Sequence, residues 1–305
     1  MKKTLIVGAA LAAGFVANAV ELAVKNPSVP FDEGLVDIGR IVASGYRGKT
    51  AVITGAASGM GLCTSKTLCA GGATVYMCDI NADGVKKAAA EINALGKGKA
   101  VAVVADVRKF ADAERAAKLA WDETGRLDLL VNFAGGNEAR VCKSYKPIYE
   151  QPIEVIDWGF DVNLRGPLYF SRACLPYMVK AKTGVIVTLG SVTGFEGDAS
   201  STYCVTKGGL DRLALTLAKA GAPFGVRAFC VAPGPVMTRP GMAGMQTLLG
   251  FPSETQEVVD FILYLSRVRS VTGTTHVIDC GRLAMGRQSS AGDFLNNAAD
   301  DRVKK

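Results

Sequence analysis

Histidine is almost absent from this chain, and none of its cysteines form a CxxC pair. The one histidine, His276, lies in the strand-like run TTHVID, where we expect it to be structural. Catalytic triads and metal sites that depend on histidine are therefore disfavoured, and we predict no metal site. The eight cysteines fall mostly within apolar segments, which is typical of buried thiols in a reducing compartment.

The sequence also lacks a basic stripe with interleaved aromatic residues. Its 35 Lys and Arg residues outnumber 28 Asp and Glu residues, but these cations are scattered along the chain. Scattered cations indicate a solvated surface, so we predict no nucleic-acid partner. With 49% hydrophobic and 21% charged residues, the chain can bury a substantial core, which argues against gross disorder.

From residue 49 onward, apolar strands alternate with amphipathic helices. The pattern predicts strands over 50–55, 74–80, 100–106 and 127–135, and helices over 61–72, 84–95 and 111–124. This alternation is typical of a parallel sheet covered on both faces. We therefore predict an α/β fold with a doubly wound parallel sheet (a Rossmann fold). The single domain covers 47–281, after a hydrophobic leader and linker over 1–46 and before a tail over 282–305.

A glycine-rich turn, TGAASGMG, separates the first predicted strand from its helix. Glycines at 55, 59 and 61 let backbone N–H groups approach a pyrophosphate, which the positive end of the helix also attracts. The next strand ends in Asp79, 18 residues beyond Gly61. A carboxylate there can accept hydrogen bonds from the adenosine ribose. The sequence therefore predicts a dinucleotide cofactor.

The cofactor is predicted to be NAD rather than NADP. Asp79 would repel a phosphate on the ribose, and no Arg or Lys lies within the glycine turn or just after Asp79 to receive one. An alternative interpretation is that Asp79 only caps the following helix, together with Asn81 and Asp83.

A candidate acid/base pair lies further along the chain. Tyr203 follows Ser191 by twelve residues and precedes Lys207 by four, in the run YCVTK. Positions i and i+4 share a helix face, so the Lys207 ammonium can lie near the Tyr203 phenol and favour its phenolate form. Such a pair suits proton transfer to or from an alcohol or ketone, and Ser191 can hydrogen-bond the same substrate oxygen. A surface Tyr and Lys on one helix are the alternative.

Together these motifs resemble the short-chain dehydrogenase/reductase family, from Gly48 to Gly281. The matching pieces occur in the order found in that family. They are TGAASGMG, Asp79, Asp106-Val107, NFAG at 132–135, Asn163 in DVNLRGP, Ser191, YCVTK at 203–207, PGPVMT at 233–238 and TGTTHVIDCG at 272–281.

The resemblance implies a catalytic tetrad of Asn163, Ser191, Tyr203 and Lys207. In it, Asn163 holds a helix distortion and a water of the proton relay, and Lys207 also reaches the nicotinamide ribose. Asn163 could instead cap a helix. The residues implied to bind the cofactor are Gly55, Ser58, Gly59, Met60, Gly61, Asp79, Ile80, Asp106, Val107, Asn132, Ala134, Gly135, Tyr203, Lys207, Pro233, Gly234, Val236 and Thr238.

Among these, Asp106 and Val107 are implied to contact the adenine, and Asn132 to stabilise the central strands. Thr238 is implied to bind the nicotinamide carboxamide. Asp106 could instead only end a strand, and Thr238 only start a turn. The sequence departs from the family at Phe133, where a second asparagine is usual, and at Cys280, where a glycine is usual.

These features predict an NAD-dependent oxidoreductase that interconverts a secondary alcohol and a ketone, with Tyr203 as general acid/base. The alternative is a noncatalytic NAD-binding or membrane-associated scaffold, although a scaffold has no need of the tetrad.

Three segments are expected to bound the substrate pocket: 136–152, 192–201 and 235–251. The last of these is rich in methionine, leucine and phenylalanine, which favours a lipophilic substrate such as a hydroxysteroid or bile acid. These apolar side chains could instead pack only against the domain. Arg140, Lys143 and Lys146 in the first segment could receive a carboxylate, although a solvated loop is the simpler interpretation.

The amino terminus holds the longest apolar stretch, over residues 4–20 behind two lysines. It is shorter than the ~20 residues that span a bilayer. Two hypotheses stay open: export as a signal or anchor, and a cytoplasmic chain that uses this helix for membrane association or subunit packing. Export would put the catalytic body where nicotinamide cofactor is scarce, so we expect a cytoplasmic protein. The family resemblance implies a homo-tetramer or dimer, with the helix after Tyr203 as a contact face.

Overall fold

The fold is described from a computed structural model, which covers residues 45–197 and 201–285. The predicted leader over 1–46 and the tail over 282–305 lie mostly outside these residues, so the hypotheses on residues 4–20 stay predictions. Across the described ranges, no helix is both long enough and apolar enough to cross a membrane.

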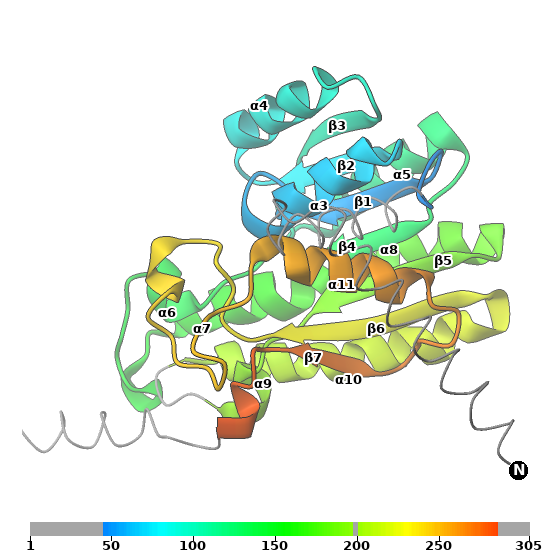
Figure 1. The fold of residues 1–305 in the computed structure, drawn as a ribbon. Coiled ribbons are helices and arrows are strands. Elements are labelled where there is room, and N and C mark those ends of the chain that lie inside the picture. The colour runs from blue at the N-terminus through cyan, green and yellow to red at the C-terminus, as the bar shows by residue number, and fades with distance from the viewer. Residues whose placement is uncertain (1–44, 198–200, 286–305) are drawn as a thin grey trace, which may run out of the picture. The chain divides into compact units, whose positions relative to one another are not determined.

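Seven parallel strands form one sheet, as the alternation of strands and helices predicts (Figure 1). Across the sheet the order is β3-β2-β1-β4-β5-β6-β7. This is the predicted doubly wound, Rossmann-type α/β fold. The strands are β1 (Thr50–Thr54), β2 (Thr74–Asp79), β3 (Lys99–Val104), β4 (Leu129–Asn132), β5 (Gly184–Leu189), β6 (Val226–Pro233) and β7 (Thr275–Ile278).

Helices cover both faces of the sheet, three long ones on each (Figure 1). On one face are α3 (Gly59–Ala70), α4 (Ala82–Asn93) and α11 (Thr255–Arg267), and on the other are α5 (Phe110–Thr124), α8 (Gly166–Ala181) and α10 (Tyr203–Gly221). The short elements are α6 (Glu138–Val141), α7 (Ile153–Phe160), α9 (Thr193–Glu196), the π-helix η2 (Asp161–Arg165), and the 3-10 turns η1 (Ile148–Glu150), η3 (Ala222–Phe224), η4 (Pro240–Met242) and η5 (Leu283–Met285).

The strand side chains point alternately to the two faces, so the core is divided in two. On β1, Ile53 belongs to the core cluster that contains residues of α3, α4 and α11, whereas its neighbour Val52 belongs to the cluster that contains residues of α5, α8 and α10. Met77 and Tyr76 on β2 repeat the same division. Because both faces are buried, each strand needs apolar residues at successive positions, which explains the continuous apolar runs in the sequence.

The chain turns sharply between β1 and α3. Gly55 and Gly59 both take left-handed backbone conformations, with φ of 66° and 52°. A Cβ on Gly61 would lie 2.2 Å from the backbone oxygen of Gly55. Only glycine therefore allows α3 to begin this close to the end of β1.

The strand order reverses between β1 and β4, which lie side by side at the centre of the sheet. At their carboxyl ends Thr54 is in register with Asn132, and Asn132 is in register with Thr188 of β5. In open parallel sheets, the crevice at such a reversal is where ligands bind. The fold therefore places the candidate site at this edge.

At the opposite edge, a partly buried carboxylate joins β1 to the loop before β4. Asp128 accepts hydrogen bonds from the Thr50 N–H at 2.9 Å and from Arg126 at 2.6 and 2.7 Å. Burial raises the pKa of Asp128, but these hydrogen bonds and the charges of Arg126 and Lys49 outweigh it, so the pKa is lowered. The charged form of Asp128 therefore stabilises the folded state.

We expect Asp128→Asn to lower the free energy of unfolding at pH 7 by about 2 kcal/mol, because a charged hydrogen-bond acceptor is lost. A carboxyl whose pKa falls on folding stabilises above its unfolded pKa, near ~3.9, and loses that effect as the pH drops further. The gap between wild type and variant should thus shrink below pH ~4, measured by urea unfolding. Asp122→Asn, which breaks only an exposed pair with Lys118, should change stability by less than ~0.5 kcal/mol; equal losses would contradict the assignment.

Gly61→Ala should destabilise the domain by about 2 kcal/mol, because the added methyl group forces α3 away from the turn after β1. The matched control is Gly241→Ala, where nothing lies within 4 Å of the added atom. Thermal unfolding of both variants tests this prediction, and an unchanged melting temperature for Gly61→Ala would show that the contact is not tight.

Candidate active site

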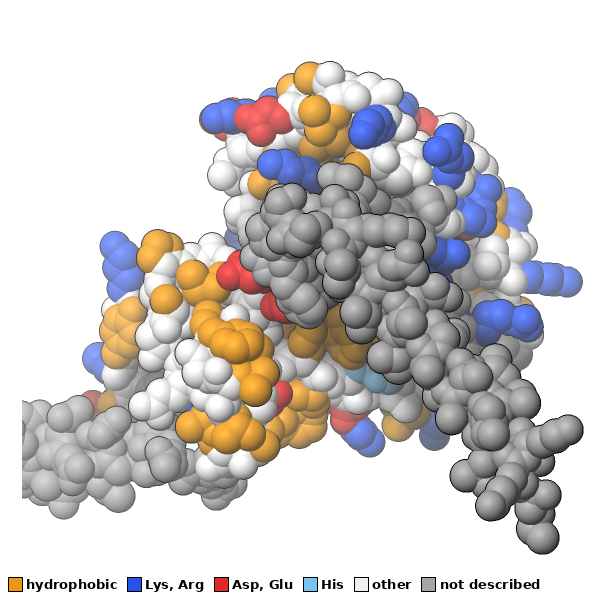
Figure 2. All heavy atoms as spheres, in the orientation of Figure 1, with side chains coloured by type: hydrophobic (Ala, Val, Ile, Leu, Met, Phe, Trp, Pro, Cys, Tyr) orange, Lys and Arg blue, Asp and Glu red, His pale blue; other side chains and the backbone are white. Residues whose placement is uncertain are grey.

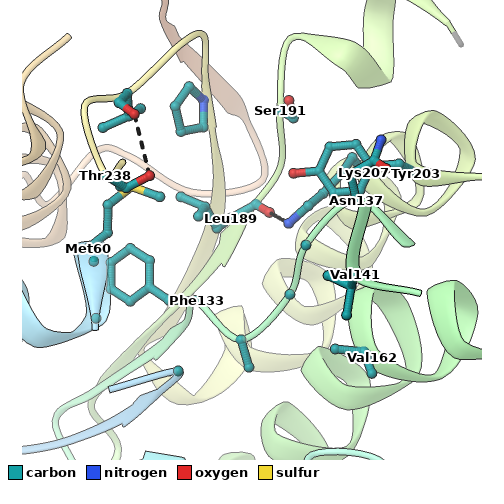
Figure 3. A pocket seen from close by; sticks show the side chains of 18 of the residues that line it. Met60, Phe133, Asn137, Val141, Val162, Leu189, Ser191, Tyr203, Lys207 and Thr238 are labelled. Atoms are coloured by element: carbon teal, nitrogen blue, oxygen red, sulfur yellow. Dashed lines mark hydrogen bonds between the residues drawn. The ribbon is translucent and has the colours of Figure 1, made fainter. Parts of the chain in front are cut away.

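A cavity of about 930 Å³ opens at the carboxyl edge of the sheet (Figure 3). Its wall is built from the glycine turn, the ends of β2 to β6 and the start of α10. Asn132 and Asn163 are buried behind this wall. The predicted site residues that line it are Gly55, Ser58, Gly59, Met60, Gly61, Asp79, Ile80, Asp106, Val107, Ala134, Gly135, Ser191, Tyr203, Lys207, Pro233, Gly234, Val236 and Thr238.

The glycine turn presents an uncapped helix end to the cavity. Ser58 precedes α3 with extended backbone and makes no capping hydrogen bond, and the first turn of α3 carries no acidic residue. A Cβ on Gly59 would reach to 3.6 Å from the Thr238 methyl group, on the opposite side of the opening. The free N–H groups and the helix dipole suit a phosphate group here, so the turn fits a dinucleotide pyrophosphate.

Asp79, the last residue of β2, lies beside the glycine turn. One carboxylate oxygen accepts the Ala57 N–H and the other accepts the Asn81 N–H, both at 2.9 Å. The cap of α4 is formed by Asn81, whose side chain accepts the Gly84 N–H. Asp79 thus holds the glycine turn and still lines the cavity, where its free lone pairs can accept further hydrogen bonds.

A second carboxylate, Asp106, lies on the same part of the wall. Arg108 donates to both of its oxygens, with a shortest contact of 2.7 Å, and this hydrogen bonding lowers the pKa of Asp106. Arg108 itself lines the cavity, and sequence reasoning missed it. The sequence did offer a signal for Arg108, because it follows Asp106, the end of a predicted strand, by two residues.

Tyr203 and Lys207 lie in the first two turns of α10, with the Lys207 ammonium 5.5 Å from the Tyr203 ring centre. The ammonium donates to the backbone oxygen of Leu189, the last residue of β5, at 2.6 Å (Figure 3). Burial lowers the pKa of Lys207 to about 8. The i, i+4 spacing therefore brings the two side chains together as predicted.

The predicted lowering of the Tyr203 pKa is wrong. Burial raises the pKa of the phenol to about 12, although a hydrogen bond with Ser191 and the charges of Arg239 and Arg140 act to lower it. Desolvation disfavours the phenolate more strongly than these groups favour it. The phenol is therefore protonated at neutral pH and can act as a proton donor.

Asn163 lies in the π-helix η2 between α7 and α8, which agrees with the implied helix distortion. Its amide accepts the Gly136 N–H at 2.8 Å and donates to the Gly136 oxygen at 2.9 Å. A Cβ on Gly135 would lie 2.7 Å from the Asn163 side-chain oxygen and 3.6 Å from the Lys207 ammonium. Asn163 thus anchors the loop after β4 directly behind the Tyr203 and Lys207 pair.

Asn132 joins the central strands, as the resemblance implies. Its side-chain nitrogen donates to the Val187 oxygen of β5 at 3.3 Å. The hydroxyl oxygen of Thr54, on β1, accepts the Ala134 N–H at 3.1 Å. The loop after β4 is therefore held from both neighbouring strands.

Glu138, a buried residue in α6, holds the start of α10, and sequence reasoning missed it. One carboxylate oxygen accepts both the N–H and the hydroxyl of Thr202, the residue before Tyr203. The other oxygen is buried without a hydrogen-bond partner among the described residues. No spacing in the sequence pointed to Glu138, because its partner lies 64 positions away.

The three segments expected around the substrate pocket all contribute to the wall, but not with every side chain named for them. Met242, Met245 and Arg140 line the cavity, whereas Lys143 and Lys146 do not. Leu248 and Leu249 are 64% and 61% exposed, and hydrophobic atoms gather on the surface over this segment (Figure 2). Of the methionine, leucine and phenylalanine side chains of segment 235–251, only Met242 and Met245 line the cavity.

Outside the cavity wall, His276 packs edge-on against Phe229 and Phe261 and bonds Thr274, which agrees with a structural role. Burial was expected for most of the eight cysteines, but only four are buried, three are partly buried and Cys142 is exposed. Among the described residues, no three potential ligands gather to hold a metal ion.

The two residues that depart from the family motifs, Phe133 and Cys280, have different effects on the structure. Phe133 is buried on the cavity wall, where it packs beside the glycine turn. Cys280 takes a left-handed conformation, with φ of 51°, at a position where glycine is usual. A side chain there costs of order 1 kcal/mol in backbone strain. Its sulfur lies 3.3 Å from the Ser253 hydroxyl.

The comparisons with known proteins agree with this geometry. The family model described as short chain dehydrogenase matches residues 49–246. The chain is 34% identical over 257 residues to the oxidoreductase UcpA of Escherichia coli K12, covering 77% of this chain and 94% of that one. It is 33% identical over 251 residues to the trans-4-hydroxycyclohexanecarboxylate dehydrogenase of Sinomonas cyclohexanicum, covering 77% and 93%.

Two further similarities concern the cofactor. A 2-dehydro-3-deoxy-L-rhamnonate dehydrogenase (NAD(+)) of a Sphingomonas strain is 34% identical over 194 residues, covering 63% of this chain and 74% of that one. A 3-oxoacyl-[acyl-carrier protein] reductase of Brucella melitensis, solved with bound NAD, superposes with a TM-score of 0.71 at 30% identity, covering 78% and 92%. Because the family model matches more than half of the chain and the fold is shared, the chain belongs to the short-chain dehydrogenase family of oxidoreductases, whose cofactors are nicotinamide dinucleotides.

Proposed function

We propose that this protein is an NAD-dependent dehydrogenase that interconverts a secondary alcohol and a ketone. One observation carries the proposal: Ser191, Tyr203 and Lys207 line the same cavity as the glycine turn after β1. A cofactor that rests its pyrophosphate on that turn can extend its reactive ring toward the phenol. The substrate carbon would then lie between the ring and Tyr203.

Proton transfer is assigned to Tyr203. When bound, the nicotinamide accepts or donates the hydride at the carbon that bears the oxygen. In reduction, the Tyr203 phenol gives its proton to the ketone oxygen; in oxidation, the phenolate takes the proton from the alcohol hydroxyl. The raised pKa of Tyr203 favours the protonated phenol at neutral pH, which suits the reduction direction, whereas oxidation should accelerate as the pH rises.

Ser191, Lys207 and Asn163 are proposed to support this step. Ser191 lines the same cavity as Tyr203, acts to lower the pKa of the phenol, and can hold the substrate oxygen. Lys207 contacts the end of β5 and lies near Gly135, where it can also reach a ribose hydroxyl and replace the proton that Tyr203 gives up. Asn163 would complete the relay behind the loop after β4, through the backbone of Gly136.

The preference for NAD over NADP is proposed on the basis of Asp79. Its carboxylate lines the cavity beside the glycine turn and would repel a ribose phosphate. The remaining cofactor contacts are carried over from the family motifs: Asp106 and Val107 to the adenine and Thr238 to the nicotinamide carboxamide. Arg108 is already paired with Asp106, so it is not free to offset the charge of Asp79.

A hydroxysteroid or bile acid is retained as a candidate substrate, on the support of Met242 and Met245 alone. The rival to the enzyme hypothesis is a noncatalytic NAD-binding or membrane-associated scaffold. A scaffold gives no reason for a buried ammonium beside a phenol in the cofactor cavity. We further infer a cytoplasmic homo-tetramer or dimer, with residues 4–20 available for membrane association.

Tyr203→Phe should lower the rate of NADH formation from a panel of secondary alcohols by at least ~100-fold, because the proton-transfer group is removed. Binding of NADH, followed by its fluorescence, should be unchanged within ~2-fold, since a phenyl ring keeps the packing. The control is Tyr264→Phe, an exposed residue of α11, which should retain wild-type rates. Equal rates for Tyr203→Phe and wild type would remove Tyr203 from the reaction.

The wild-type protein should use NAD at least ~10-fold more efficiently than NADP in kcat/KM, because the Asp79 carboxylate repels the phosphate. Asp79→Asn should reduce this ratio by about 10-fold through the KM for NADP, since an amide is uncharged but still accepts hydrogen bonds. Asp83→Asn, which removes an exposed carboxylate nearby on α4, should leave the ratio unchanged. A wild-type preference for NADP would contradict the role given to Asp79.

A further inference from the structure

Two arginines face the cavity near the Tyr203 phenol, and the proposed reaction uses neither. Arg140 belongs to α6, and Arg239 directly follows Thr238, before η4. Both line the cavity and both are exposed to it. The Arg140 guanidinium lies against the loop after β4, where a Cβ on Gly136 would come within 3.3 Å of it.

The charges of Arg140 and Arg239 both act on the part of the cavity around the Tyr203 phenol. Each lowers the pKa of the Tyr203 phenol, and Arg140 also lowers the pKa of Arg239, after burial. Positive charge from two separate chain segments is therefore concentrated where the substrate must lie. This charge is at the catalytic end of the cavity, whereas the carboxylates of Asp79 and Asp106 are on the part of the wall assigned to the adenosine.

Neither guanidinium has a carboxylate partner among the described residues. The other two arginines of the cavity wall do: Arg282 pairs with Glu196 at 2.8 Å, and Arg108 pairs with Asp106 at 2.7 Å. Two like charges held close together without a counter-ion are unfavourable, and an anion bound between them would relieve the repulsion. Guanidinium groups bind carboxylates through paired hydrogen bonds.

We propose that Arg140 and Arg239 bind a carboxylate group of the substrate, so that the alcohol is a hydroxy acid and the ketone an oxo acid. This inference rests on the proposed function and narrows its substrate class. Two relatives bear names that describe such substrates, a 2-dehydro-3-deoxy-L-rhamnonate and a trans-4-hydroxycyclohexanecarboxylate. The carboxylate takes no part in the bond changes; it anchors the molecule while its carbinol group faces Tyr203.

The first test compares binding to the complex with NADH, by calorimetry. The probes are cyclohexanecarboxylate, gluconate and cholate, each paired with its uncharged amide. We expect at least one acid to bind at least ~10-fold more tightly than its amide, with Arg140→Gln and Arg239→Gln each removing that difference. Arg172→Gln, on the exposed side of α8, is the control and should retain it.

The second test uses turnover. With trans-4-hydroxycyclohexanecarboxylate and its amide as substrates, each arginine variant should raise the KM for the acid at least ~10-fold more than the KM for the amide. If all three acids bind no better than their amides, the proposal fails. If Arg239→Gln weakens NADH binding instead, Arg239 belongs to the cofactor and the pairing is overturned.

These outcomes separate the inference from the proposed function. Tyr203→Phe should still bind the acid as wild type does, because it keeps both arginines. Conversely, oxidation of the acid that depends on Tyr203 but not on either arginine would leave the dehydrogenase assignment standing and reject the carboxylate site.

Discussion

The site depends on one buried charge. Lys207 is 5% exposed, and its ammonium donates to the backbone oxygen of Leu189, where β5 ends, at 2.6 Å. A buried ammonium without such an acceptor would be costly, so the contact fixes α10 against the sheet. Tyr203 lies one turn earlier on the same helix, and its position over the cavity follows from that attachment. The Asn163 side chain holds the loop after β4 behind this pair, through hydrogen bonds to the backbone of Gly136.

Negative and positive side chains line different parts of the cavity wall. Carboxylates of Asp79 and Asp106 lie on the same part of the wall as the glycine turn, while the guanidiniums of Arg140 and Arg239, which have no carboxylate partner among the described residues, act on Tyr203. In the proposed function, the two ends select different parts of the ligands through electrostatics, and the uncapped end of α3 between them binds the pyrophosphate. The backbone provides most of the geometry, and side-chain charge determines which molecules fit it.

Much of this arrangement could be predicted from local sequence. Apolar runs identified the strands because both sheet faces are buried, and the i, i+4 spacing identified the contact between Tyr203 and Lys207 because both lie on one helix. The direction of the Tyr203 pKa could not be predicted this way, since it depends on how much of the phenol the fold buries. Glu138 was missed because its partner, Thr202, comes from a distant segment. The exposure of Leu248 and Leu249 depends on the path of one loop.

The hydrogen bond between Asp79 and the Ala57 N–H has a consequence for engineering. The carboxylate proposed to choose between the two nicotinamide cofactors also clamps the turn that would hold their common pyrophosphate. An exchange of Asp79 for a small neutral residue would loosen that clamp while it removed the charge. Redesign toward NADP would therefore require a replacement acceptor for Ala57 as well as a new cation.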